Sequence, residues 1–444
     1  MASAITLSRI NRAAIPLNYG ATDYDALLQW IGDRRLVLIG EASHGTHDFY
    51  RERARITRRL IEEKGFNMVA IEGDWPDAYR VNRFVRGLGA GATTRDANAR
   101  EALGDFLRFP AWMWRNMDVL GFVEWMWEFN SKRSAEARAG FYGLDLYSLH
   151  ASIRAVLGYL DKVDPEGAQR ARYRYACFDH FGEDPQAYGY ASSFKLSRSC
   201  EDEVVAQLVE MRRRCGDLAS RDGRVDPDAY FFAEQNARLI RNAESYYRAM
   251  FEGRAESWNV RDRHMAESLA WLCQIRPKAR IVVWAHNSHL GDASATEMSA
   301  RGEVNLGQLT RERFGDEVFL LGFTTHSGEV TAAARWDAPA ERKIVRPALE
   351  GSYEAMFHQT RIPSFLLPMH DPAVARALAE PRLERAIGVI YQPRTERESH
   401  YFKCHLPNQF DAVIHIDRTK ALIPFELTSG WKAGELPETY PYAV

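Results

Sequence analysis

The chain has 444 residues, of which 46% are hydrophobic and 27% are charged, and its formal net charge is −2. This composition is typical of a globular protein with a sizeable core, and the length allows one large domain or two to three ordinary ones. Because acidic and basic residues nearly balance, the charge gives no reason to expect nucleic acid or an anionic membrane as a partner.

The N-terminal segment and the cysteines bear on where the protein works. The first 20 residues contain no apolar core behind a basic start, and no run of about 18 apolar residues occurs, so neither a secretory signal nor a membrane span is expected. The cysteines are odd in number and lack C-x-x-C spacing, which argues against a disulfide framework or a thiolate metal site. We therefore expect a cytoplasmic protein. The cysteines are Cys177, Cys200, Cys215, Cys273 and Cys404.

Seven short apolar runs, each ending in polar or small residues, predict the strands. Continuous runs of this length are typical of strands buried on both faces, hence of a largely parallel sheet. Between the first two runs, Phe49, Ile56, Leu60 and Ile61 lie on one helical face and Gly65 is placed to cap the helix, which predicts a βαβ unit. The runs are residues 35–40, 67–73, 139–145, 280–287, 318–325, 386–392 and 411–417.

Between about residues 150 and 271 the strand signal disappears and a 3.6-residue periodicity takes its place. No Pro-, Gly- or Ser-rich linker flanks this part, so we expect a helical insertion and not a freely linked domain. The predicted fold is α/β, with a mainly parallel central sheet flanked by helices. Residues 1–149 and 272–444 would form the α/β core that carries the catalytic residues. Residues 150–271 would form a helical lid over the crevice at the carboxyl ends of the strands.

Polar residues gather where the predicted strands end. In an open α/β sheet, ligands bind beyond the carboxyl ends of the strands, so these positions are the informative ones. Loops are commonly polar because they face water, and this accounts for one or two such residues. It does not readily account for two H-x-x-H turns, at 44–47 and 286–289, at the same edge of the sheet. We therefore predict a site there. The residues that follow the first five runs include Glu41, His44, His47, Glu72, Asp145, His286, His289 and His326.

An imidazole beside a carboxylate is the usual general base, and with water as nucleophile this arrangement gives hydrolysis. A second imidazole or an arginine could polarise a carbonyl. A serine nucleophile is a competing possibility, because Ser43, Asp145 and His286 follow one another in the order of an α/β-hydrolase triad. However, Gly40 lies one residue too far from Ser43 for the G-x-S-x-G elbow, and Ser43 is expected to cap the next helix.

A metal site is the other competing possibility. His44, His47, Glu72, His286 and His289 are acceptable ligands for zinc or a related divalent ion. The H-x-x-H spacing is shared with many loops that bind no metal, and the H-E-x-x-H motif is absent. The favoured expectation is therefore that no cofactor is needed, with divalent metal kept as the alternative.

Three stretches together resemble the erythromycin esterase family across about residues 20–430. They are "LIGEASHGTHDFYRERARITRRLIEEKGFNMVAIEGDW", "VVWAHNSHLGD" and "WNVRDRHMAESL". The resemblance implies an α/β core with a helical insertion, and hydrolysis of a macrolactone ester by activated water. It implies that His44 is the general base and that Glu41, Arg53, Glu72, His286 and His289 complete the site; Arg53 enters only through the resemblance.

The sequence also departs from the macrolide-inactivating members. An additional His47 and the pair Tyr50–Arg51 resemble a broader, mostly uncharacterised branch, and the lactone-binding surface cannot be matched. Macrolide hydrolysis and antibiotic resistance are therefore expectations about relatives.

Further residues are candidates for binding a substrate. Trp112 and Trp114 lie in an aromatic-rich stretch, 108–129, where core packing is the ordinary role and a cleft wall the alternative. Asn259 is expected to cap a following helix, with Arg261 near its amino end. The resemblance makes Arg261 a candidate for contacting an anion. His47, Asp145 and His326 complete the predicted substrate-binding set.

The favoured hypothesis is a hydrolase that acts on a small-molecule ester or lactone. His44 would deprotonate water, a Glu72–Arg53 pair would fix the geometry, and His286 and His289 would polarise the carbonyl. Two alternatives stay open. One is a metal-dependent hydrolase of amide or phosphate bonds that uses the same cluster, and the other is a non-catalytic binding protein for a small ligand. The sequence leaves the oligomeric state and the substrate open.

Overall fold

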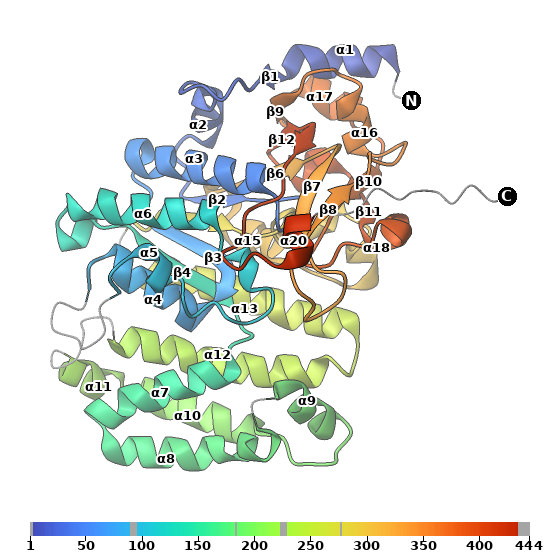
Figure 1. Cartoon of the computed structure of the whole chain (residues 1–444). Helices are drawn as coiled ribbons and strands as arrows, with labels where there is room; N and C mark the ends of the chain where they lie inside the picture. Colours follow the sequence, from blue (N-terminus) through green and yellow to red (C-terminus); the bar gives the residue numbers. More distant parts are fainter. Residues whose placement is uncertain (1–2, 89–95, 183, 223–228, 276–277, 434–444) are drawn as a thin grey trace.

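An eight-stranded sheet forms the centre of the molecule in the computed structural model, which describes residues 3–88, 96–182, 184–222, 229–275 and 278–433 (Figure 1). The strand order is β1-β9-β12-β6-β2-β5-β3-β4. The six strands from β12 to β4 run parallel, and β9 and β1 pair antiparallel at one edge. The prediction of an α/β fold with a mainly parallel sheet is therefore confirmed.

The strands of this sheet are β1 (Ile15–Pro16), β2 (Leu36–Ile39), β3 (Met68–Asp74), β4 (Gly140–Asp145), β5 (Ile281–Trp284), β6 (Val318–Thr324), β9 (Ser364–Pro368) and β12 (Ala412–Ile416). Two small sheets lie outside it, formed by β10 (Arg382–Arg385) with β11 (Tyr401–Cys404), and by β13 (Arg418–Thr419), β7 (Ser327–Ala332) and β8 (Glu341–Val345).

Successive residues of the central strands enter two different cores, which is why the apolar runs are continuous. In β2, Leu36 and Leu38 pack into one core, and Val37 and Ile39 pack into the other. The first core is closed by α1, α12, α13 and the helices around them, and the second by α2, α3 and α6. Both faces of the sheet are therefore covered by helices.

The longer helices on the two sides are α1 (Ala4–Ala13), α2 (Asp25–Ile31), α3 (His47–Lys64), α4 (Trp75–Val85), α6 (Met117–Ser131), α7 (Leu149–Val163), α8 (Pro165–Tyr175), α9 (Pro185–Ser193), α10 (Glu201–Arg213), α11 (Cys215–Asp222), α12 (Ala229–Ala249), α13 (Arg254–Ile275) and α15 (Leu306–Phe314). The shorter ones are α5 (Ala99–Ala102), α14 (Asn287–Leu290), α16 (Tyr353–His358), α17 (Pro372–Ala377), α18 (Glu396–Ser399), α19 (Leu406–Gln409) and α20 (Ser429–Ala433).

The helix between the first two predicted strands, α3, ends as expected but begins three residues later than Ser43 predicts. Gly65 caps its C-terminus in the left-handed conformation, with φ of 68°. Thr46 is the N-cap residue, and Ser43 instead forms a hydroxyl–hydroxyl hydrogen bond to Thr46. The prediction that Ser43 caps this helix is wrong. Strands β2 and β3 run parallel and with α3 form the predicted βαβ unit, but they do not pair with each other, because β5 lies between them.

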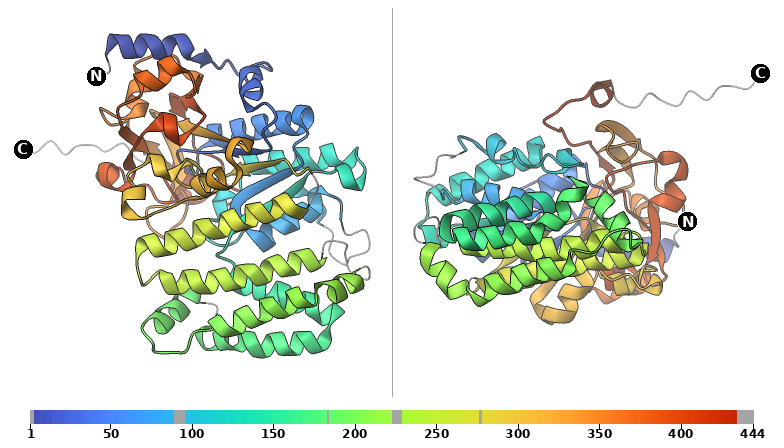
Figure 2. Two further views of the ribbon diagram at one scale, coloured as in Figure 1. Left: turned by 180° about the vertical axis from the view of Figure 1, so that it is seen from behind. Right: turned by 90° about the horizontal axis from the view of Figure 1, so that it is seen from below.

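Helices α7 to α13 stack in layers on one side of the sheet (Figures 1 and 2). Helix α13 packs on β4, α12 packs on α13, and α7 and α10 pack on α12. Where the structure describes it, the region predicted to lack strands, 150–271, consists of helices and the turns between them. The division at residues 149/150 and 271/272 stays a prediction, and α13 runs through the second of these positions.

Residues 386–392 form no strand, so this part of the strand prediction is wrong. Ile387 and Ile390 make only isolated bridges, to Ser43 and Ala333 respectively. Gly388 separates the two bridged residues and Pro393 follows the run, which explains why no ladder extends along it.

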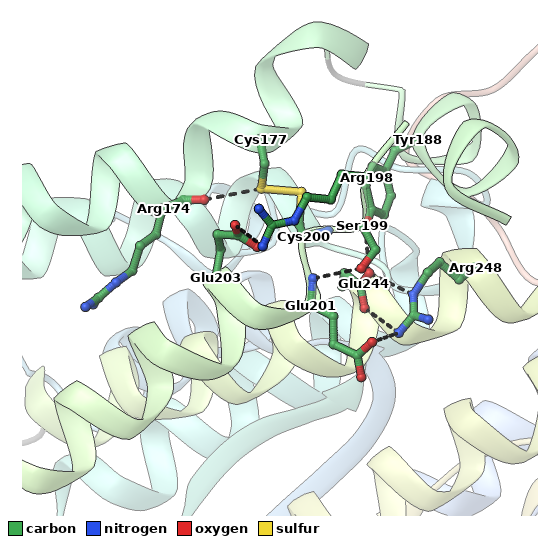
Figure 3. Close-up of a disulfide and its surroundings, with 10 residues drawn as sticks. All are labelled: Arg174, Cys177, Tyr188, Arg198, Ser199, Cys200, Glu201, Glu203, Glu244 and Arg248. Carbon is green, nitrogen blue, oxygen red and sulfur yellow. Dashed lines mark hydrogen bonds and ion pairs between the residues drawn. A yellow bond between two sulfur atoms is a disulfide. The ribbon is translucent and has the colours of Figure 1, made fainter. Parts of the chain in front are cut away.

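Cys177 and Cys200 form a disulfide, which corrects the expectation drawn from the cysteine spacing (Figure 3). Cys177 lies in the 3-10 helix Ala176–Phe181, and Cys200 is the N-cap residue of α10. The chain turns back through α9 between them, so residues 23 positions apart meet with a Cα–Cα distance of 5.9 Å. A disulfide persists most readily in an oxidising compartment, whereas the predicted cytoplasmic location remains untested. No helix in the described part of the chain is both long and apolar enough to cross a membrane.

Candidate functional site

A cavity of about 220 Å³ lies at the carboxyl ends of β2, β3 and β4. This is the edge at which the sequence predicts a site. The predicted site residues that line it are His44, Glu72, Trp114, Asp145, Arg261 and His289. The other lining residues are Gly73, Asp74, Asp77, Phe106, Arg108, Pro110, Ala111, Met113, Tyr147, Trp336 and Val389.

His44 and Glu41 form a hydrogen-bonded pair in the loop after β2. Nδ1 of His44 lies 2.8 Å from Oε1 of Glu41, and both side chains are buried. The other carboxylate oxygen, Oε2, lies 3.0 Å from Nη2 of Arg53, whose side chain is fully buried. Because a carboxylate paired with arginine can only accept, Nδ1 carries a proton, and in the neutral ring the lone pair is on Nε2. The predicted Glu72–Arg53 pair is wrong, because α3 points Arg53 at Glu41.

Glu72, near the end of β3, is surrounded by positive and polar groups. Its Oε1 lies 2.7 Å from Nη2 of Arg261 and 3.3 Å from Nε2 of His289, and its Oε2 accepts a hydrogen bond of 2.8 Å from the backbone N–H of His286. Nε2 of His44 lies 3.9 Å away, beyond hydrogen-bond reach. Burial alone would raise the pKa of Glu72, but His289 and Arg261 outweigh burial and hold this pKa well below its usual range. Glu72 is therefore ionised.

His289 and Asp262 form a second histidine–carboxylate pair that faces Glu72. Nδ1 of His289 lies 2.9 and 3.0 Å from the two carboxylate oxygens of Asp262, and its ring stacks on Trp258 with centroids 4.4 Å apart. Burial opposes the charged imidazolium, but the carboxylates of Asp262 and Glu72 outweigh it and raise the pKa of His289. Nη1 of Arg261, 2.9 Å from Nε2, can donate only to the neutral ring, so His289 lies between two protonation states.

Arg261, on α13, binds the carboxylate at the end of β4. Its Nε and Nη2 lie 3.0 and 2.7 Å from the two oxygens of Asp145, which makes a bidentate ion pair. Its guanidinium also lies over the ring of Tyr147, 4.9 Å from the centroid. Burial raises the pKa of Asp145, but Arg261 outweighs burial and lowers it. The predicted capping role of Asn259 is wrong, because α13 begins at Arg254 and Asn259 lies within the helix.

His286 lies beside His44, with ring centroids 4.8 Å apart. It is the N-cap residue of α14, and the backbone N–H of Ser288 donates to its Nδ1 at 3.2 Å. Nδ1 therefore carries a lone pair and Nε2 carries the proton. Burial, followed by the nearby His44, lowers the pKa of His286 well below its usual value, so this ring is neutral. Neither His286 nor Glu41 lines the cavity; both lie behind His44.

Three predicted substrate-binding residues lie outside the cavity lining. His47 faces Asp118 on α6, with Nδ1 2.8 Å from Oδ1. His326 lies between β6 and β7 and stacks on His358 of α16, with ring centroids 3.8 Å apart. Trp112 is buried in the second core, whereas Trp114 both belongs to that core and lines the cavity. Trp112 thus has only the core-packing role, whereas Trp114 packs in the core and also forms part of the cavity wall.

Several lining residues escaped the sequence prediction. Arg108 and Tyr147 lie together, with the guanidinium 4.4 Å from the ring centroid, and Nε of Arg108 donates to Asp74 at 2.9 Å. Asp77 is largely buried, and burial together with the charge of Asp74 raises its pKa to about 8. Trp336 projects from the β7–β8 loop and is 49% exposed. The position of Tyr147, two residues after Asp145, is a usable signal, but nothing in the sequence ties Arg108 or Trp336 to this edge.

The residues considered as metal ligands are engaged by other partners. Among the described residues, no group of three or more His, Cys, Asp or Glu side chains is arranged to hold a metal ion. Glu72 and His289 both contact the guanidinium of Arg261, which takes the place a cation would occupy between them. The Nδ1 lone pair of His286 accepts from the backbone, and Nδ1 of His44 faces Glu41. Most of these donor atoms are therefore already engaged, and the expectation that no cofactor is needed stays a prediction.

Comparisons with known proteins agree on one family. The sequence model described as erythromycin esterase matches residues 61–419, a range that contains Glu72 and Arg261 but begins after His44. YbfO of Bacillus subtilis is 23% identical over 428 residues, which cover 92% of this chain and 90% of that protein. The erythromycin esterase type II of Escherichia coli is 22% identical over 324 residues, which cover 70% of this chain and 73% of that enzyme.

Solved structures show the same fold. A succinoglycan biosynthesis protein superposes with a TM-score of 0.75 at 21% identity, over 94% of this chain and 97% of that one. A mutant of the erythromycin esterase EreC in its open conformation gives a TM-score of 0.64 at 17% identity, over 89% and 93% of the two chains. With the family model matching most of its length, the chain belongs to the erythromycin esterase family, and this membership supports a hydrolytic function.

Proposed function

We propose that the protein hydrolyses a carboxylic ester or lactone and that His44 activates the attacking water. The observation that carries this proposal is the Glu41–His44 pair at the cavity wall. Nδ1 is held at 2.8 Å by the carboxylate, so the lone pair of Nε2 is on the side of His44 that reaches the cavity. A histidine oriented in this way is suited to take a proton from water.

The proton path uses groups already in contact. As the water oxygen bonds to the ester carbonyl carbon, Nε2 of His44 takes the water proton, and Glu41 stabilises the imidazolium that forms. The carbonyl oxygen gains negative charge. When the intermediate collapses, the bond from carbon to the leaving oxygen breaks, and His44 returns its proton to that oxygen. The products are a carboxylic acid and an alcohol, or a hydroxy acid from a lactone.

Positive charge opposite His44 supports the developing oxyanion. Arg261 and His289 line the same cavity, and the raised pKa of His289 favours its charged form. Preorganised donors in a site with little water are the largest single contribution to many acyl-transfer reactions. Glu72 and Asp145 hold the guanidinium in place, so the donors need no rearrangement when charge develops.

The family relatives suggest which esters to test first. The Escherichia coli relatives are named as erythromycin esterases, so a macrolactone is one candidate substrate. The cavity is also lined by aromatic and charged side chains such as Phe106, Arg108 and Trp336, which could contact other esters. Simple aryl esters, alkyl esters, lactones and a macrolide form the appropriate panel.

A matched pair of variants tests the proposal. His44→Asn removes the base, and kcat on the best ester should fall about 10²–10⁴-fold with the fold intact. His180→Asn, on the exposed side of the helical layers, should leave kcat unchanged. Full turnover by His44→Asn would overturn the role of His44, and absence of turnover on every ester would favour a non-catalytic binding protein. Activity that is lost on chelation and restored by zinc would favour the metal-dependent alternative.

A further inference from the structure

A buried carboxyl group lies behind the site, on the side away from the cavity. Glu384 belongs to β10, about 340 residues after His44, and its side chain is inaccessible to solvent. Its Oε1 accepts a hydrogen bond of 3.1 Å from Nδ2 of Asn287, and its Oε2 accepts one of 3.2 Å from the thiol of Cys404. Glu384 therefore contacts Asn287, which lies between His286 and His289 in the chain.

Asn287 connects the two histidine–carboxylate pairs. Its backbone N–H donates to the carbonyl oxygen of Glu41 at 2.9 Å, and its Nδ2 also donates to the carbonyl oxygen of Phe323 at 2.7 Å. A Cβ atom at Gly40 would lie 2.1 Å from Oδ1 of Asn287, so the amide packs directly against the backbone before Glu41. A shift of Asn287 would therefore displace Glu41 on one side and His289 on the other.

The chain that follows Glu384 holds the same loop from a second point. The backbone N–H of His44 donates to the carbonyl oxygen of Ile387 at 3.1 Å, and the N–H of Ile387 donates to the carbonyl oxygen of Ala42 at 2.8 Å. Two residues later, Val389 lines the cavity. Residues 384–389 thus contact the backbone of His44 and the side chain of Asn287 together.

We infer that Glu384 is a positioning residue: through Asn287 it sets the relative placement of the Glu41–His44 pair and of His289. This inference rests on the proposed function for its effect on turnover, but not for its effect on the histidines themselves. Glu384 lines no part of the cavity and touches no reacting group. Its effect on the site is therefore indirect.

The surroundings of Glu384 suit an uncharged acid better than a carboxylate. Burial, with the charge of Glu354 on α16 as the next cause, raises the pKa of Glu384 to about 8. The titratable groups that face it are Glu354 and Tyr353 on α16, Cys404 on β11 and, on β10 itself, Arg385.

Arg385 is engaged elsewhere, which leaves Glu384 without a dedicated cation. Its Nε lies 3.1 Å from Glu396, and its other nitrogens donate to the carbonyl oxygens of His326 and Arg346. Glu384 should therefore ionise only as the pH rises past neutrality, and the carboxylate formed has no counter-ion of its own. The hydrogen bond between Glu384 and Asn287 should change over that same range of pH.

Three variants separate positioning from general stability. Glu384→Leu removes the acceptor for Asn287. Glu384→Gln keeps an acceptor for Asn287 beside the same neighbour, Gln409, but it cannot become charged. Ser352→Ala is the matched control, because Ser352 is uncharged, equally buried and adjacent to β10, and its hydroxyl accepts from the backbone N–H of Ala355 with no contact to Asn287.

The first measurement is the pKa of His44 and His289, from NMR of protein labelled with 15N-histidine, and it needs no substrate. Glu384→Leu should shift both pKa values by at least half a unit and lower kcat at least tenfold with little change in KM. Glu384→Gln should restore both properties at neutral pH, and Ser352→Ala should change neither, although it lowers Tm by removing the N-cap of α16.

If Glu384→Leu does not fold, the pH dependence of kcat and of the His289 resonances, compared between wild type and Glu384→Gln, tests the inference instead. Wild type should lose kcat, and show displaced His289 resonances, above about pH 8, whereas Glu384→Gln should keep both to higher pH. Unchanged histidine pKa values in Glu384→Leu, equal effects of Ser352→Ala, or identical alkaline behaviour of wild type and Glu384→Gln would each overturn the inference. If no ester is hydrolysed, the histidine resonances still test it, so its failure is distinct from that of the proposed function.

Discussion

Arg261 and Asp145 join the helical layers to the central sheet by a bidentate ion pair, with Nε–Oδ1 and Nη2–Oδ2 distances of 3.0 and 2.7 Å. The same guanidinium contacts Glu72 and His289. One cation on α13 therefore serves two carboxylates at the ends of β4 and β3. This arrangement places the positive charge opposite His44 and fixes α13 against the sheet at the same point.

Replacing Arg261 should affect stability and activity together. Arg261→Ala leaves Asp145 and Glu72 buried without their cation, and loss of one partner of a buried pair costs about 3–5 kcal/mol. Arg261→Lys keeps the charge but cannot form the bidentate contact, so it should be less destabilised than Arg261→Ala and still have low kcat. Urea unfolding and ester kinetics measure the two effects.

The control for this prediction lies on the same helix. Arg263 is exposed, so Arg263→Ala should change the free energy of unfolding by less than about 0.5 kcal/mol and leave kcat unchanged. If Arg261→Ala behaves like Arg263→Ala, the guanidinium is not the group that connects helix and sheet.

The sequence predicts the position of those site residues that directly follow or end a strand. Glu41, Glu72 and Asp145 could be placed at one edge because each ends or follows a continuously buried run, and parallel strands bring such ends together. The link between Glu41 and His44 is likewise local. The fold class follows from the same runs, since only strands covered on both faces read as unbroken apolar segments.

The partners that depend on how distant elements pack could not be predicted. Arg53 and Arg261 are both arginines on helices, and only the packing of α13 on β4 shows that Arg261, and not Arg53, faces Glu72. The start of α13 was misplaced because Asn259 resembles a capping residue, whereas its amide bonds the chain at Gly302 and Val304. The Cys177–Cys200 pairing similarly depends on the turn through α9, which the spacing of the cysteines does not reveal.

Asp262→Asn should lower the pKa of His289, because it removes the nearer of the two carboxylates that raise it. A histidine whose pKa is raised in the folded state stabilises the fold fully below the unfolded-state value of about 6.5, and this contribution is lost as the pH rises through the folded-state pKa. The difference in unfolding free energy between wild type and Asp262→Asn should therefore be largest in acid and shrink toward alkaline pH.

The pH dependence of kcat should also reflect the charge of His289. If charged His289 stabilises the oxyanion, the alkaline limb of the kcat profile moves to lower pH in Asp262→Asn. Glu267→Gln, an exposed change on the same helix, should leave the limb in place. An alkaline limb that Asp262→Asn does not move would show that His289 acts as a neutral donor.

Breaking the disulfide should destabilise the helical layers without removing the catalytic groups. The bond closes a loop of 23 positions, for which chain entropy gives about 3 kcal/mol. Cys200→Ser should therefore lower Tm by several degrees, and a reducing agent should lower the Tm of wild type to the same value. Cys215→Ser, at an exposed free cysteine, is the control. Equal Tm values for wild type with and without reductant would contradict a formed disulfide.

The backbone at Gly45, directly after His44, leaves no room for a side chain. A Cβ atom there would lie 1.8 Å from the carbonyl oxygen of Thr331, and this contact is to backbone that cannot rotate away. Gly45→Ala should therefore displace the loop, cost about 1–3 kcal/mol and lower kcat by an order of magnitude or more. The same substitution at Gly121, inside α6 with nothing within 4 Å, should instead stabilise the protein by about 0.5–1 kcal/mol. If urea unfolding shows that Gly45→Ala lowers the free energy of unfolding while Gly121→Ala raises it, the loop that carries His44 is fixed by its contact with β7. A stable Gly45→Ala variant with full activity would show that this contact does not fix the loop.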